Sequence, residues 1–318
     1  SVILAPHASA LACTLSRLKT AIAKGKSLPT GVSAGFTMNA LPETDTEESL
    51  KDAIKRISLR YNAMERMTSK IVLGKLPSLI ISGPPGMQKS WTVDHELDKS
   101  ERQRFDFTAS IKANSNNGDE LDEDGEPLTQ VYNASNLFDK IGGNCSSVGL
   151  YHSLWNMRNG GIVYLDDCDA IFRDEDTLNI LKIATDSTKE RLISWRKNSA
   201  WLEEYQIDRT FDFRGHVVFL TNIDFEKVIE RGHKDSEHFK ALIDRASYLC
   251  LTLSTRRDFM IRIRMVSEGD NGILMKSYGL DKKEGKTVLN YVDENQTRFY
   301  NLSIRLVCQI AIALRADI

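Results

Sequence analysis

The chain has 318 residues, enough to bury a sizeable core in one large domain with an appendage or in two domains. Its 42 Lys and Arg residues nearly balance its 44 Asp and Glu residues, so no overall basic field indicates nucleic acid, although this average can hide a local basic patch. The five cysteines are scattered without zinc-finger spacing, and no apolar run reaches the ~18 to 20 residues that span a bilayer. We therefore expect reduced thiols, a cytoplasmic location and no membrane partner.

The beginning of the chain, residues 1–45, is predicted to be an N-terminal extension and linker, because its end is rich in turn formers and small residues. A long helix is expected from Glu47 to about Leu73, where apolar residues recur mostly at steps of three and four. The short apolar segment 78–81 then predicts a buried strand. A glycine-containing loop follows it, and residues 89–103 are typical of a helix that leads away from the loop.

Strand, loop and helix in this order are typical of a phosphate-binding loop. Consecutive backbone N–H groups and the start of the helix would cradle a phosphate. Lys89 would reach the terminal phosphates, and the Ser90 hydroxyl would hold Mg²⁺. The usual pattern has glycine immediately before the lysine, whereas this chain has Gln88 there. We assign nucleotide contacts to the residues of this loop, which are Gly83, Pro84, Pro85, Gly86, Met87, Gln88, Lys89, Ser90 and Trp91.

An acidic run rich in Gly and Asn, residues 114–127, is interpreted as a solvated insertion rather than a metal site, because its acids and glycines lack the spacing of a calcium loop. Beyond it, short apolar segments alternate with segments typical of helices. The expected strands are 161–165, 191–195 and 215–224, and the expected helices are 149–159 and 175–187. This alternation predicts a parallel sheet covered by helices on both faces.

The pattern changes after Leu253, where the remaining segments are mainly helical. We therefore expect three parts: the N-terminal extension, an α/β core over residues 46–253, and a small helical lid domain over residues 254–318. The predicted fold class is α/β, the parallel sheet of P-loop NTPases flanked by helices, followed by a helical C-terminal domain.

Two carboxylates follow the apolar strand that ends at Leu165. Asp166 stands at the end of this strand, where it can hold the water shell of a magnesium ion. Asp167 comes next and can polarise an attacking water. The alternative, a strand-end turn with surface acids, is less favoured because the whole strand is typical of the protein interior.

Three further side chains stand near the ends of later elements. Asn222 follows an apolar strand, where its amide can bind an attacking water or a terminal phosphate. Arg245 precedes another apolar stretch, and Arg305 lies in the first part of a late helix. A lone arginine is usually a solvated surface residue, so the order of the motifs carries the interpretation rather than any one of them.

Taken in this order, the motifs resemble those of the AAA+ ATPase family over about residues 60–310. GPPGMQKS is similar to the first nucleotide motif, IVYLDDCDAIF to the second, and FLTN to the first sensor. The resemblance is greatest to AAA+ ATPases encoded by bacteriophages. It implies that Asp167, Asn222, Arg245 and Arg305 are catalytic, with Arg245 as the finger that reaches a neighbouring subunit and Arg305 as the second sensor. It further implies ATP as ligand, Mg²⁺ held by Ser90 and Asp166, and a homo-oligomeric, hexameric ring.

Two departures from the family pattern affect the expected activity. Gln88 replaces a glycine whose permissive backbone lets the loop wrap the phosphates, although its N–H remains available. Asp167 replaces the usual glutamate and is one methylene shorter, yet aspartate can also orient a water. We therefore expect a working nucleotide site with slow hydrolysis.

The resemblance also implies a segment that lines the pore of the ring, about residues 140–149. This segment is rich in glycine and lacks the aromatic residue of peptide-threading members, although Phe138 precedes it, and Lys140 is its one basic residue. Three functions stay open: a motor or loader acting on nucleic acid or a nucleoprotein assembly, a protein-remodelling ATPase, and a weakly hydrolysing nucleotide-dependent scaffold. A phage-encoded protein of any of these kinds would work in the host cytoplasm.

Overall fold

The structure is a computed structural model, and it describes residues 48–106, 134–187, 190–232 and 236–315. The expected N-terminal extension and the acidic run 114–127 lie outside these residues. The chain forms two compact units, and each is described by itself. One contains the parallel sheet and runs over residues 59–83 and 89–252, and the other contains residues 48–58, 84–88 and the C-terminal helices from residue 253. The domain boundaries expected from the sequence stay a prediction.

The sheet unit is built on six strands in the order β2-β3-β4-β7-β1-β8, and every neighbouring pair is parallel. The strands are β1 (Ser78–Ser82), β2 (Gln103–Arg104), β3 (Leu137–Gly142), β4 (Ile162–Asp166), β7 (His216–Thr221) and β8 (Ser247–Cys250). The central strands β1, β4 and β7 are almost wholly buried, as a parallel sheet with two covered faces requires. The predicted parallel α/β fold is therefore confirmed.

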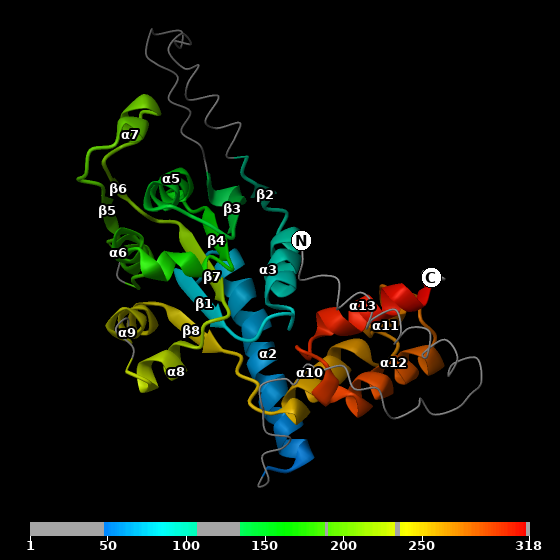
Figure 1. Cartoon of the computed structure of the whole chain (residues 1–318). Coiled ribbons are helices and arrows are strands. Elements are labelled where there is room, and N and C mark those ends of the chain that lie inside the picture. The colour runs from blue at the N-terminus through cyan, green and yellow to red at the C-terminus, as the bar shows by residue number, and fades with distance from the viewer. Residues whose placement is uncertain (1–47, 107–133, 188–189, 233–235, 316–318) are drawn as a thin grey trace, which may run out of the picture. The chain divides into compact units, whose positions relative to one another are not determined.

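Helices cover both faces of this sheet (Figure 1). The picture shows α5, α6 and α9 along one face and α3 along the other. The helices of the unit are α3 (Lys89–Lys99), α5 (Ser147–Met157), α6 (Glu175–Ala184), α7 (Ala200–Glu204), α8 (Phe225–Glu230) and α9 (Ser236–Arg245), with 3₁₀ turns η1 (Ala134–Asn136) and η2 (Asp169–Arg173). The long helix α2 (Leu50–Val72) precedes β1, and its predicted bounds are confirmed to within a few residues.

One predicted strand lies outside the main sheet. Residues 191–195 contain β5 (Leu192–Ser194), which pairs antiparallel with β6 (Thr210–Asp212) in a separate two-stranded sheet. Only Ile193 of β5 is fully buried, whereas Leu192 is exposed. A strand exposed on one side is typical of a hairpin at the periphery rather than of the centre of a parallel sheet.

The C-terminal helices carry their own start signals. They are α10 (Arg256–Ser267), α11 (Ile273–Lys276), α12 (Lys282–Glu294) and α13 (Ile304–Arg315), with the 3₁₀ turn η3 (Gln296–Arg298) before α13. Thr255 caps α10 by accepting a hydrogen bond from the N–H of Asp258, and Asp281 and Glu284 form a reciprocal capping box at α12. The predicted helical C-terminal part is confirmed.

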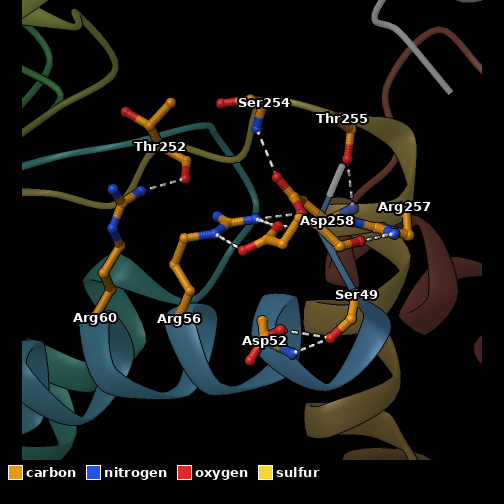
Figure 2. A network of polar contacts seen from close by, with 10 residues as sticks. Ser49, Asp52, Arg56, Arg60, Thr252, Ser254, Thr255, Arg257 and Asp258 are labelled. Atoms are coloured by element: carbon orange, nitrogen blue, oxygen red, sulfur yellow. Dashed lines mark hydrogen bonds and ion pairs between the residues drawn. The ribbon is translucent and has the colours of Figure 1, made fainter. Parts of the chain in front are cut away.

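A polar network joins α10 to the first turns of α2 within this helical unit (Figure 2). The Arg56 guanidinium donates to both carboxylate oxygens of Glu48 and, through Nη2, to Asp258 Oδ1 at 2.9 Å. Asp258 also accepts a hydrogen bond from the backbone N–H of Ser254. Hydrogen bonds of this kind satisfy a buried carboxylate that would otherwise be costly to hold inside the protein.

Among the described residues, no helix is both long and apolar enough to cross a membrane.

Candidate functional site

The carboxyl end of the central strands brings together three of the predicted site residues. Lys89 begins α3 directly after the phosphate loop, and its side chain is buried. Its Nζ donates to the backbone oxygen of Gly83 at 2.6 Å and to Asn222 Oδ1 at 2.9 Å. The second contact follows from topology, because β1 and β7 are neighbours and their last residues, Ser82 and Thr221, are in register.

Asn222 also contacts Asp167. The Asn222 Nδ2 donates to Asp167 Oδ1 at 2.9 Å, so the same amide accepts from an ammonium on one side and donates to a carboxylate on the other. The Asp167 side chain is exposed, and its backbone has a φ of 55°, in the left-handed region. Few residues other than glycine adopt this region, although aspartate is among those that tolerate it. The chain thus holds Asp167 in an uncommon conformation at the end of β4.

The predicted magnesium ligands are neighbours as well. The Ser90 hydroxyl donates to Asp166 Oδ1 at 2.9 Å, and the Tyr164 hydroxyl lies 3.3 Å from Asp166 Oδ2. A hydroxyl and a carboxylate side by side are the hard oxygen ligands that Mg²⁺ prefers, usually together with several waters. The donor set therefore fits a magnesium ion bound by Ser90 and Asp166.

Lys140 is a member of this cluster that the sequence did not reveal. Its Nζ contacts both oxygens of Asp94 at 2.7 and 2.9 Å, lies 3.4 Å from Asp166 Oδ2, and stands 4.7 Å from the centre of the Tyr164 ring. Burial and the nearby carboxylates raise the pKa of Tyr164, which keeps its hydroxyl protonated. The cluster thus places one fixed ammonium next to the carboxylate that would hold magnesium.

The position of Lys140 corrects part of the expected pore segment. Residues 140–142 belong to β3, where Lys140 is in register with Tyr164, and α5 begins at residue 147. The connection between β3 and α5 is therefore residues 143–146, and Lys140 lies in the sheet rather than in a loop. Whether this connection lines a pore stays a prediction.

Asp169 is another acid near the site that sequence reasoning left unassigned. Its Oδ1 accepts a hydrogen bond from the Thr221 hydroxyl at 2.6 Å, which joins the segment after β4 to the end of β7. Burial raises the pKa of Asp169, partly opposed by this hydrogen bond. The third acid of the DDCD run is thus a structural tie that supports the geometry of Asp167 and Asn222.

The middle of the phosphate loop, residues 84–88, belongs to the helical unit. Gly86 has a φ of 71°, and a Cβ placed on it would lie 2.8 Å from the Cβ of Ser303, so only glycine fits there. The backbone N–H of Ile304, the first residue of α13, donates to the Gly86 oxygen at 3.1 Å. A Cβ on Gly86 would also lie 3.7 Å from the Cβ of Arg305, whose side chain is exposed. The predicted second sensor therefore stands beside the phosphate loop.

The remaining loop residues have different environments. Met87 is buried. Gln88 has a φ of 71°, and its Oε1 accepts a hydrogen bond from Arg262 Nη2 at 3.0 Å. Trp91, on α3, is 54 % exposed, and its ring stacks on His95 with centroids 4.7 Å apart. Its assigned contact with a nucleotide stays a prediction.

Arg245 lies apart from the residues around Lys89. It is the last residue of α9, where its Nη1 donates to the Ala241 oxygen and its Nε lies 3.5 Å from Asp186 Oδ2. Its side chain is 40 % exposed and borders a hollow of about 400 Å³. The other residues that line this hollow are Asn179, Lys182, Ile183, Asp186 and Glu190. Arg245 is thus accessible from outside the unit and directed to Asp186, an acid just beyond the end of α6.

Comparison with known proteins finds a relative at the level of sequence. No protein-family model matches the chain. The chain is 32 % identical over 274 residues to the uncharacterized 36.7 kDa protein in the nrdC-mobD intergenic region of Enterobacteria phage T4, covering 86 % of this chain and 74 % of that protein. The chain belongs to the family of this phage T4 protein.

Solved structures resemble the chain with lower sequence identity. NtrX from Brucella abortus in complex with ATP shares 13 % identity and covers 87 % of this chain with a TM-score of 0.37, and the complex with ADP covers 92 % with a TM-score of 0.32. Drosophila ORC bound to DNA shares 12 % identity, with a TM-score of 0.27, and covers 93 % of this chain and 72 % of that one. The chain spans about half the length of the NtrX chains, 54 % and 56 %.

Proposed function

We propose that this chain is an ATP-binding and ATP-hydrolysing AAA+ ATPase, encoded by a bacteriophage. The observation that supports this most is the chain of hydrogen bonds from Lys89 through Asn222 to Asp167, beside the pair of Ser90 and Asp166. A cation, a hydroxyl, two carboxylates and an amide at the carboxyl end of a parallel sheet are what phosphoryl transfer to water needs. Ligands of α/β sheets also bind at this end of the strands.

Each residue has a separate role in the proposed hydrolysis. Lys89 would neutralise charge on the terminal phosphate, and Asn222 would hold the attacking water or that phosphate. Asp167 would orient the water and take its proton as the new bond to phosphorus forms and the bond to the bridging oxygen breaks, giving ADP and inorganic phosphate. Magnesium held by Ser90 and Asp166 would supply positive charge to the phosphate oxygens.

The contacts of Lys89 offer a way for nucleotide to act on Asn222. Lys89 donates to Gly83 and Asn222, and a terminal phosphate would compete with these acceptors for the ammonium. Asn222 would then be released from the ammonium while it still contacts Asp167. This exchange would give nucleotide a direct way to change the position of Asp167.

We further propose that the protein acts as a homo-oligomeric ring, a hexamer, on nucleic acid or a nucleoprotein assembly. The exposed Arg245, which lies apart from Lys89 and Asp167, supports a role toward a neighbouring subunit. Arg305 would act as the second sensor from within its own chain, as the resemblance to AAA+ ATPases implies. A weakly hydrolysing scaffold is the second candidate, and the hydrogen bond that restrains Asp167 favours it. Protein remodelling is the third.

The experiment that separates these functions is the rate of phosphate release from Mg·ATP. We would measure it for the protein alone, with single-stranded DNA, with double-stranded DNA and with an unfolded protein. Stimulation by DNA supports the motor or loader, and stimulation by unfolded protein supports remodelling instead. Asp167→Asn sets the background, because its amide keeps the shape but cannot take the proton of water. A wild-type rate equal to that background under all conditions would contradict the ATPase and leave the scaffold.

A further inference from the structure

Gln88 adopts a backbone conformation that is unfavourable for its residue type. Its φ of 71° lies in the left-handed region, as does that of Gly86 two residues earlier. Glycine reaches this region without steric cost, whereas a residue with a Cβ does not. Such conformations persist only where surrounding interactions hold them. The loop therefore contains one position that needs support and one that does not.

The support for Gln88 comes from α10. Arg262 Nη2 donates to Gln88 Oε1 at 3.0 Å, a contact between residues 174 positions apart. Arg262 is 7 % exposed and Gln88 is half-buried, so the hydrogen bond is partly shielded from water. Because its donor is ionised, it belongs to the stronger class of hydrogen bonds.

We propose that Arg262 is a positioning residue of the phosphate loop, which holds Gln88 in its left-handed conformation and so fixes the direction of the backbone N–H groups next to Lys89. This inference rests on the proposed nucleotide site. A glycine at position 88 would adopt the same turn unaided. In this chain the turn depends instead on Arg262 of α10, in the helical unit. The Ile304 N–H donates to the Gly86 oxygen and so connects the loop to α13 as well. Any shift of α10 relative to the loop therefore changes how well the loop holds a phosphate.

A double-mutant cycle tests this dependence by isothermal titration calorimetry with Mg·ATP. The proteins are the full-length wild type, Arg262→Met, Gln88→Gly and the double variant. We expect Arg262→Met to weaken binding about tenfold in the wild-type loop, the size of one charge-assisted hydrogen bond. In the Gln88→Gly loop the same change should have an effect of about twofold or less, because glycine needs no support. An equal loss in both loops would overturn the proposal.

Two further variants separate positioning from general damage to the helix. Arg262→Lys keeps a charged donor and should retain most of the affinity. Arg264→Met is the matched control, because Arg264 lies on the same helix but pairs with Asp293 at 2.7 Å, and its loss should leave nucleotide affinity unchanged. A loss for Arg264→Met equal to that for Arg262→Met would show that the effect is not specific to the loop contact.

Amide hydrogen exchange of residues 86–90 tests the same link without nucleotide. Arg262→Met should speed exchange in the wild-type loop and leave the Gln88→Gly loop unchanged. If Arg262→Met does not fold, Gln88→Leu removes the acceptor instead and should speed exchange in the same way. Unchanged exchange in folded variants would overturn the link. Failure of the wild type to bind Mg·ATP would contradict the proposed function alone, because the exchange measurement still decides the contact.

Discussion

Asn222 donates a hydrogen bond from Nδ2 to Asp167 Oδ1 at 2.9 Å, across the ends of the neighbouring strands β7 and β4. The opposite end of the same amide accepts from Lys89. The Asn222 side chain therefore links Lys89, which would meet the terminal phosphate, to Asp167, which would orient water. In this arrangement, contact between Lys89 and a phosphate would alter the hydrogen bonding of Asp167 through Asn222.

Replacing Asn222 should separate binding from hydrolysis. In Asn222→Ala, Lys89 keeps its contact with Gly83 and can still bind phosphate, but Asp167 loses its tether. We expect Mg·ATP affinity within a few-fold of wild type and turnover lower by about 10² to 10³, the usual size for one lost transition-state donor. Phosphate release and calorimetry measure the two quantities. Asn290→Ala, at an exposed position on α12, is the control. Unchanged turnover in Asn222→Ala would contradict the role of Asn222 in hydrolysis.

Arg245 should couple hydrolysis to assembly. We expect Arg245→Ala to bind Mg·ATP nearly normally and to lose turnover by about 10³ to 10⁵, the range for an arginine supplied by a neighbour. Mixing it with Lys89→Ala should restore part of the turnover, because the Lys89→Ala subunit donates its intact Arg245 to the intact pocket of the other variant. Arg214→Ala, at another exposed arginine, should behave as wild type. Co-assembled mixtures without any recovery would argue that Arg245 acts within its own chain or is a surface residue.

The strand-end acids and the amide were predictable because each follows a buried strand, and parallel strands end at the same edge of a sheet. The contact of Lys140 with Asp166 was not, because it depends on the non-local pairing of β3 with β4. The hydrogen bond of Arg262 to Gln88 was hidden for the same reason: no local pattern links positions so far apart. The short apolar segment of β5 did predict a strand, but its length cannot tell a peripheral hairpin from the main sheet.

The ion pair of Arg56 and Asp258 should stabilise the helical unit. Asp258 is 1 % exposed, so Arg56→Met leaves a buried carboxylate with less compensation (Figure 2). We expect the free energy of unfolding to fall by about 2 to 3 kcal/mol, less than for a wholly buried pair, because Arg56 itself is 31 % exposed. Urea denaturation measures this. Arg60→Met, which removes one hydrogen bond to the Thr252 oxygen, should cost about 1 kcal/mol, and equal losses would show that the pair has no special role.

His152 should make stability depend on pH. Its side chain is fully buried against the Trp201 ring, and burial lowers its pKa to about 4. Because the folded pKa lies below the unfolded value of about 6.5, the unfolded chain binds more protons between these values. Stability from neutral His152 is therefore present above about pH 6.5 and is lost as the pH falls toward 4.

The size of this effect is on the order of 3 kcal/mol across the window. We would measure urea unfolding at several pH values for wild type and His152→Gln, which removes the titrating group and should flatten the dependence. His216, whose pKa is also lowered by burial, should leave a smaller slope in the variant. Identical slopes for wild type and His152→Gln would contradict the assignment.

The central claim is that Lys89 and the loop before it bind the phosphates of ATP, and calorimetric titration of the full-length protein with Mg·ATP tests it most directly. We predict saturable binding by the wild type and by Lys99→Ala, which removes an exposed lysine from the same helix. Lys89→Ala should bind about 100-fold more weakly or without measurable heat, because it lacks the buried ammonium that would meet the terminal phosphate. Binding by folded Lys89→Ala as tight as that of the wild type would contradict the nucleotide site.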